Sequence, residues 1–205
     1  MSFTSIWLFI PTFFFVSITP GMCMLLALTL GMSIGVRKAM WMMWGELLGV
    51  AVVACAAALG VAALILKLPE AFIVLKIVGG AYLIWLGYQM WCSRGKLVLD
   101  GSDTATQKKG LDLAINGFVT AIANPKGWAF FITLLPSFLI AEEPLAPQLS
   151  VMISLILLLE FSSLMLYATG GKALRHLLLN KHNVKLLNRI SGSLMILVGC
   201  WLAIG

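Results

Sequence analysis

Six long apolar runs dominate the sequence, and they constrain the fold more than any other feature. They lie at residues 3–32, 39–66, 71–92, 112–140, 148–170 and 190–204, and only the last is short. About 20 apolar residues in a helix cross the roughly 30 Å of hydrocarbon in a bilayer. Because lipid offers no hydrogen-bond partner to an open backbone, such segments cross it as helices. The sequence therefore predicts an all-α integral membrane protein with six transmembrane helices.

The composition excludes an ordinary soluble protein. Of the 205 residues, 61% are hydrophobic and only 11% are charged, whereas a soluble domain has about 25% charged residues. Little sequence remains outside the apolar runs, so we expect a single transmembrane domain over residues 1–205. The cysteines form no CxxC pair, and we expect them to be small packing residues without a metal or a disulfide. They are Cys23, Cys55, Cys92 and Cys200.

The basic residues predict how the helices are oriented. Eleven of the fourteen lie in the loops between the first and second, third and fourth, and fifth and sixth runs: Arg37, Lys38, Arg94, Lys96, Lys108, Lys109, Lys172, Arg175, Lys181, Lys185 and Arg189. Short cytoplasmic loops carry an excess of Lys and Arg. We therefore expect these loops in the cytoplasm and both termini on the other side. Since the basic residues act as orientation signals, nucleic acid is set aside as a partner.

The two halves of the chain resemble each other weakly. Three pairs correspond, 105, 114 and 113 residues apart: Pro20 with Pro125, Glu46 with Glu160, and residues 76–79 (KIVG) with 189–192 (RISG). With three helices in each half the halves have opposite orientations, as in many secondary transporters that bind substrate near the membrane midplane. We expect two inverted repeats, at 1–95 and 108–205. The alternative is chance similarity in an apolar chain rich in glycine.

The first and fourth runs each contain a proline that should break the helix. The segments are Thr19-Pro20-Gly21 and Asn124-Pro125-Lys126-Gly127. Proline lacks an amide hydrogen and its ring clashes with the preceding turn. The second half of a broken helix begins with free amides and a partial positive charge, which can hold a carboxylate. The alternative is a kink that serves only packing, but two breaks at corresponding positions favour a substrate site.

Charged side chains inside the apolar runs are the other candidate site residues. Glu160 lies in 155–166, which has no other charge, and an ionised carboxylate there is costly. We expect it to bind a coupling proton or a substrate amine; the alternative is a protonated glutamate bonded to another helix. Glu46 is similar, although it lies nearer the cytoplasmic end of its run. Lys126 either counters a carboxylate of the protein or substrate, or extends to the interface.

Several motifs are absent from the sequence. There is no G-x-x-x-x-G-K-[ST] phosphate loop, so we expect an ion gradient to drive transport. No H-E-x-x-H motif, G-x-S-x-G motif or His/Cys cluster is present, which argues against a membrane-embedded hydrolase and a dedicated metal site. We expect no enzyme activity, no cofactor and no metal.

Four segments carry a resemblance to a known family. They are Thr19-Pro20-Gly21, Gly45 with Gly49, residues 79–87 (GGAYLIWLG), and Asn124-Pro125-Lys126 followed by Phe130-Phe131 and Pro136. Together, over nearly the whole chain, they resemble the LysE/RhtB family of bacterial amino-acid exporters. The resemblance implies a permease of the bacterial cytoplasmic (inner) membrane that exports amino acids or close derivatives, in exchange for protons. It carries over as substrate-site residues Thr19, Pro20, Gly21, Asn124, Pro125 and Lys126.

The chain departs from the family pattern at two places. The family usually continues with Pro and Asn after the first glycine, whereas this chain has Met22 and Cys23, which removes a polar side chain from the expected site. Many members also place an acid after the second glycine of helix two, where this chain has Val50. Glu46 lies one turn earlier and is the candidate replacement.

These observations together predict a proton-coupled amino-acid exporter in the lipid bilayer. The two broken helices meet at the midplane and hold the substrate carboxylate, while Glu160 and Glu46 bind the amine or the proton. The glycines of the second and third runs pack helices either within one chain or between two copies in a homo-oligomer. Two other functions stay open: transport of another small solute, such as a sugar, metal cation or lipid precursor, and a non-transporting membrane subunit.

Overall fold

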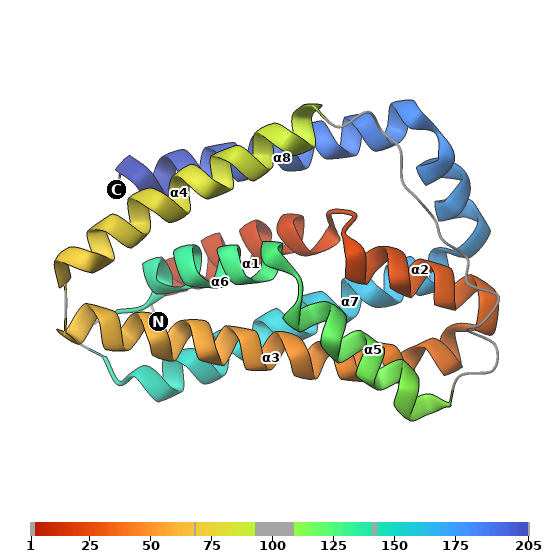
Figure 1. The fold of residues 1–205 in the computed structure, drawn as a ribbon, viewed down its shortest axis with the longest axis horizontal. Coiled ribbons are helices and arrows are strands. Elements are labelled where there is room, and N and C mark those ends of the chain that lie inside the picture. Colours follow the sequence, from red (N-terminus) through yellow and green to blue (C-terminus); the bar gives the residue numbers. More distant parts are fainter. Residues whose placement is uncertain (1–2, 68, 93–108, 141–142, 205) are drawn as a thin grey trace.

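The computed structural model describes residues 3–67, 69–92, 109–140 and 143–204. All regular structure in these residues is helical (Figure 1). Each of the six apolar runs coincides with one helix or with two helices separated by a break. In chain order the helices are α1 Phe3–Ile18, α2 Met22–Ile34, α3 Val36–Lys67, α4 Pro69–Cys92, α5 Gly110–Ile122, α6 Pro125–Leu134, the 3-10 turn η2 Leu135–Phe138, α7 Leu145–Leu179 and α8 Lys181–Ile204.

Several of these helices are long and apolar enough to cross a membrane. Within the described residues three qualify alone: Val36–Val61, Leu145–Gly171 and His182–Trp201. The α1–α2 pair, bent by 58° at its break, qualifies as a fourth if it counts as one span. The expected all-helical membrane protein is therefore supported. The six spans and the inverted repeat stay predictions, and three of the basic loop residues (Arg94, Lys96 and Lys108) lie outside the described residues.

Both predicted helix breaks are present, but the last predicted loop is wrong. The chain leaves the helix between Ile18 and Met22, and again before Pro125. Residues 171–189, expected as a loop, instead continue α7 beyond a kink at Gly171 (φ 44°) and form the start of α8. The basic residues of this segment interrupt its apolar pattern, but Leu, Lys and Arg are good helix formers, so the charges end the apolar run without ending the helix.

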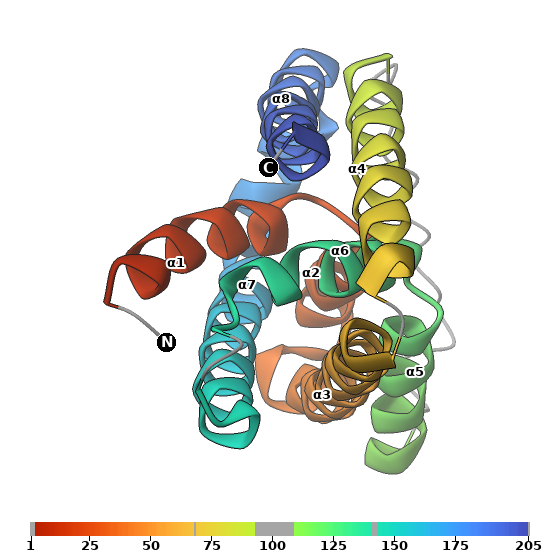
Figure 2. The ribbon, with the colours of Figure 1, turned by 90° about the vertical axis from the view of Figure 1, so that its left-hand side faces the viewer.

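The helices form three layers that run roughly along the long axis. Figures 1 and 2 show the α4–α8 pair on one side, the broken helices α1, α2 and α6 in the middle, and α3, α5 and α7 on the other side. The most extensive contacts are those of α4 with α8, α3 with α5 and α2 with α7. The middle layer, which contains both breaks, therefore lies between two layers of helices, and one face of α1 stays exposed, with Phe15 44% exposed.

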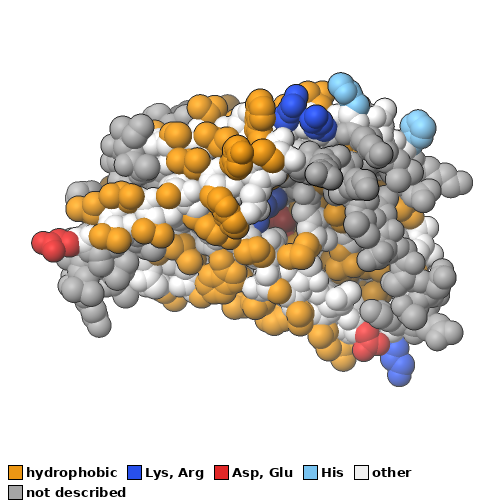
Figure 3. Space-filling model, turned by 45° about the horizontal axis from the view of Figure 1, so that its top comes forward, with side chains coloured by type: hydrophobic (Ala, Val, Ile, Leu, Met, Phe, Trp, Pro, Cys, Tyr) orange, Lys and Arg blue, Asp and Glu red, His pale blue; other side chains and the backbone are white. Residues whose placement is uncertain are grey.

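The surface has the character expected of a protein surrounded by lipid. Figure 3 shows hydrophobic side chains over the middle of the face in view, with most of its charged side chains and both histidines toward the ends. Large apolar side chains such as Trp44, Leu59 and Val78 are 56–60% exposed, which water would not favour over a whole face. Near the centre of this face, an acidic and a basic side chain are visible inside a hollow.

Glycines permit the closest helix crossings. A Cβ at Gly45 on α3 would overlap the Ala114 carbonyl of α5, and one at Gly117 would overlap the Met42 carbonyl. The α4–α8 crossing is similar, because a Cβ at Gly87 would lie 2.6 Å from the Gly192 carbonyl oxygen. Small residues let backbones approach in this way in membrane helices. Of the two alternatives left open by the sequence, packing within one chain accounts for these glycines.

We predict that a side chain at Gly45 destabilises the fold, whereas the same change at Gly60 does not. Both glycines lie on α3, but nothing lies within 4 Å of a Cβ at Gly60. Overpacking a close contact typically costs about 1–3 kcal/mol. Gly45→Val should therefore lower the thermal unfolding midpoint in detergent by several degrees or abolish a monodisperse peak, while Gly60→Val should match the wild type. Equal midpoints for the two variants would contradict the close crossing.

Candidate functional site

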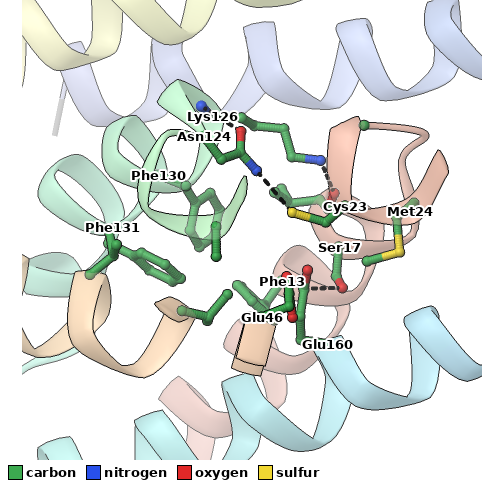
Figure 4. Close-up of a pocket in the computed structure, with 16 residues that line it drawn as sticks. Phe13, Ser17, Cys23, Met24, Glu46, Asn124, Lys126, Phe130, Phe131 and Glu160 are labelled. Atoms are coloured by element: carbon green, nitrogen blue, oxygen red, sulfur yellow. Dashed lines mark hydrogen bonds between the residues drawn. The ribbon is translucent and has the colours of Figure 1, made fainter. Parts of the chain in front are cut away.

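The two helix breaks meet at one cavity in the middle of the molecule. Its lining comes from α1, α2, α3, α5, α6, α7 and the break before α6: Phe13, Val16, Ser17, Gly21, Cys23, Met24, Glu46, Val50, Val53, Ala121, Asn124, Lys126, Gly127, Phe130, Phe131 and Glu160. The cavity volume is about 40 Å³, which holds a few water molecules. Figure 4 shows the polar side chains gathered around it.

Lys126 occupies the gap that Pro20 leaves in the hydrogen bonding of α1. In an unbroken helix the carbonyl of Val16 would accept a bond from the amide of residue 20, but proline has no amide hydrogen. The Lys126 ammonium donates to that carbonyl oxygen at 2.8 Å and to the Thr19 carbonyl oxygen at 3.4 Å. A side chain beside the second break thus supplies the hydrogen bond that is missing at the first break. Lys126 points into the protein rather than to the interface (Figure 4).

Other side chains bind the remaining groups at the end of α1. The Tyr167 hydroxyl of α7 donates to the Ile18 carbonyl oxygen at 2.9 Å. The Thr19 hydroxyl lies 2.7 Å from the Phe15 carbonyl oxygen and 2.8 Å from the Ser191 hydroxyl of α8. Since the end of a helix leaves carbonyls without partners, these bonds fix where α1 stops relative to α7 and α8.

Asn124 and Trp128 organise the second break. Asn124 is the N-cap of α6, because its Oδ1 accepts a bond from the Lys126 amide at 3.2 Å, and Pro125 takes the first helical position, where no amide is needed. The Trp128 indole donates to the Ile122 carbonyl oxygen at 2.8 Å. Residues in the first turn of both α2 and α6 line the cavity, so the positive ends of two helix dipoles meet there.

Two carboxyl groups from different helices also meet in the cavity. Glu160 of α7 accepts a hydrogen bond from the Ser17 hydroxyl of α1, and Ser17 lies 3.1 Å from the Ser163 hydroxyl. Glu46 of α3 is fully buried, and neither of its carboxyl oxygens has a geometric hydrogen-bond partner. Figure 4 shows the two carboxyls side by side. An unpaired buried charge is costly, so this pair is sensitive to protons and to any cation that enters.

The structure brings together most of the residues that the sequence pointed to. Glu46, Glu160, Asn124, Lys126 and Gly21 line the cavity, whereas Thr19, Pro20 and Pro125 shape the breaks around it without lining it. Among the described residues no cluster of three His, Cys, Asp or Glu side chains is arranged to hold a metal.

Sequence reasoning missed several residues of the site. Ser17 lines the cavity. Its position, a polar residue just before the first break, was the sequence signal that could have identified it. Cys23, expected only to pack, lines the cavity with its sulfur 3.9 Å from Asn124 Nδ2. Tyr167 was missed because its role depends on a contact with Ile18 that spans 149 residues of sequence.

We predict that the Lys126 bond to α1 matters because of Pro20. Lys126→Met leaves the Val16 carbonyl unpaired, which should cost about 1–3 kcal/mol. In Pro20→Ala the new amide can bond that carbonyl, so the double variant should lose less stability than the sum of the single losses. Thermal unfolding in detergent of the four proteins provides the test. Strict additivity would show that Lys126 and Pro20 act independently.

Comparisons with known proteins identify the family of the chain. The family model described as LysE type translocator matches residues 14–205. The homoserine/homoserine lactone efflux protein of Salmonella typhimurium is 29% identical over 203 residues, which cover 99% of this chain and 98% of that protein. The leucine efflux protein of Enterobacter sp. (strain 638) is 26% identical over 93% of this chain and 90% of its own length. No solved structure matches the chain.

The family match extends from the second half of α1 to the last residue and so includes both breaks, both carboxyls and Lys126. It confirms the resemblance that the sequence motifs carried. On this match, the chain belongs to the LysE family of translocators.

Proposed function

We propose that this protein exports an amino acid or a close derivative across the bacterial cytoplasmic membrane in exchange for protons. The observation that carries the proposal is the meeting of two broken helices at one cavity that contains two carboxyls and a lysine. Helix ends of this kind form substrate sites in secondary transporters. The efflux functions named for the relatives support the direction of transport and the substrate class.

The cavity offers complementary groups for both ends of a zwitterion. The substrate carboxylate binds at the amino ends of α2 and α6, where free amides and helix dipoles favour an anion, and within reach of Lys126. The substrate amine binds to Glu160, whose side chain is half-buried and faces the cavity. Because the cavity has room for only a few water molecules, the substrate enters when the helices separate.

The carboxyl pair provides the coupling to protons. Two neighbouring carboxyls in a low-dielectric site cannot both be ionised at little cost, so the pair retains a proton when the cavity is empty. A substrate ammonium replaces that proton as the partner of Glu160. Protons and substrate therefore compete for one site. A transporter that exchanges protons for substrate requires such competition.

The helix contacts support two inverted halves, with repeat one over 1–95 and repeat two over 108–205. The second helix of each half packs on the broken helix of the other half: α3 contacts α5 and α6, and α7 contacts α1 and α2. The third helices, α4 and α8, pack on each other. This pattern is unchanged when the halves are exchanged. Rocking of one half against the other would open the cavity to either side in turn, with both termini outside the cytoplasm.

We predict that Glu160→Gln abolishes coupling without abolishing binding. The measurement is uptake of a panel of labelled amino acids into inside-out vesicles, with and without an imposed proton gradient. The wild type should accumulate one or a few amino acids when the gradient is present. Glu160→Gln should still exchange labelled for unlabelled substrate, but the gradient should no longer drive accumulation. Glu46→Gln should keep gradient-driven uptake at a reduced rate, because Glu160 can still bind the proton or the amine and an amide at position 46 can donate to it.

The control is Glu70→Gln, the same change at an exposed carboxyl in the first turn of α4. It should leave uptake unchanged. Gradient-driven accumulation by Glu160→Gln would refute the coupling role of that residue. If the wild type accumulates no amino acid in vesicles where a known exporter is active, the export proposal fails, and another solute or a non-transporting role takes its place.

A further inference from the structure

The cavity has two chemically distinct ends. At one end are the polar groups of Ser17, Cys23, Asn124 and Lys126, with the carboxyls of Glu46 and Glu160 toward the middle. Figure 4 shows Phe130 and Phe131 together at the other end, on the opposite side of the cavity from Ser17 and Cys23. A zwitterion whose charged groups bind the polar end would therefore direct its side chain toward the phenyl rings.

The apolar end is built from three mutually packed rings and two valines. The ring of Phe13 lies 5.4 Å from that of Phe130 and 6.1 Å from that of Phe131, and the latter two are 5.9 Å apart, measured between centroids. Val50 and Val53 of α3 complete this wall, and all five side chains are at most 9% exposed. Their side chains carry no hydrogen-bonding group, so this wall has nothing to offer a hydroxyl or a charge.

We propose that the transported amino acid carries an apolar side chain, which lies against Phe13, Phe130 and Phe131. This inference rests on the proposed export function and adds the substrate class. A hydroxyl or ammonium on the substrate side chain would lose its water at this wall and gain no partner, which disfavours binding by about tenfold or more. Each methylene that the wall covers favours binding by about fourfold.

Competition between isosteric amino acids tests the inference. Unlabelled norvaline and homoserine have side chains of equal length, and only homoserine ends in a hydroxyl; norleucine and ornithine, also equal in length, are compared in the same way for charge. In inside-out vesicles with a proton gradient, each competes with the labelled amino acid that the protein accumulates. Norvaline should inhibit at a concentration at least about tenfold lower than homoserine does, and the inhibitory concentration of norleucine should be lower than that of ornithine by a larger factor.

A polar change in the wall should alter this preference selectively. Val50→Thr places a hydroxyl in the cavity without a change of shape, and should narrow the norvaline to homoserine ratio by about three- to tenfold. Val53→Thr is a second variant of the same kind, in case the first does not fold. Val52→Thr is the matched control: Val52 is on the same helix but is 44% exposed and does not line the cavity, so the ratio should not change.

The outcomes separate this inference from the export proposal. If homoserine or ornithine competes as well as its apolar isostere, the protein is an exporter with a different specificity, and the apolar wall does not receive the side chain. A ratio that changes equally in Val52→Thr and Val50→Thr would also overturn the assignment. If no amino acid is accumulated at all, while a known exporter is active in the same vesicles, the proposed function itself fails.

Discussion

The rest of the site depends on the hydrogen bond from Lys126 to the Val16 carbonyl, which satisfies a backbone group that Pro20 leaves without a donor. A proline inside a membrane helix removes one amide hydrogen, and lipid cannot supply a substitute. Here the missing donor is an ammonium from the other half of the chain. Tyr167 completes the neighbouring carbonyl of Ile18. Each break is thus stable only while α1, α6 and α7 hold their relative positions, so the polar groups that serve the breaks are also held around one cavity.

The same groups are suited to exchange because their partners are replaceable. In the proposed exchange, a carbonyl that binds an ammonium can release it to a substrate carboxylate, and a carboxyl that holds a proton can lose that proton when a substrate ammonium takes its place. The tight glycine crossings lie elsewhere, between α3 and α5 and between α4 and α8. Each pair takes one helix from each proposed half, so these close crossings are where one half would pivot on the other without losing its packing. Motion would then be concentrated where the contacts are polar and exchangeable, at the breaks.

Much of this architecture could be predicted from the sequence, because a bilayer imposes simple rules. The apolar runs located the helices, and Pro20 and Pro125 located the breaks. Contacts between distant residues could not be predicted: Ser17 and Glu160 meet across 143 residues, and no local pattern encodes that meeting. Residues 171–189 were wrongly expected to form a loop because their basic residues interrupt the apolar run, although Leu, Lys and Arg are good helix formers. Cys23 was expected only to pack, because a lone cysteine in an apolar run looks the same in the sequence whether or not it lines a cavity.

The reactivity of Cys23 is the most direct test of whether substrate binds in the cavity between the two breaks. Cys23 is 3% exposed and lines the cavity. In a variant that retains Cys23 and has serine at the other three cysteine positions, a membrane-permeant maleimide should label the thiol slowly, and a transported amino acid should slow labelling further. A variant that retains only Cys200, which does not line the cavity, should be unaffected. Equal labelling of Cys23 with and without a saturating transported substrate would contradict the account.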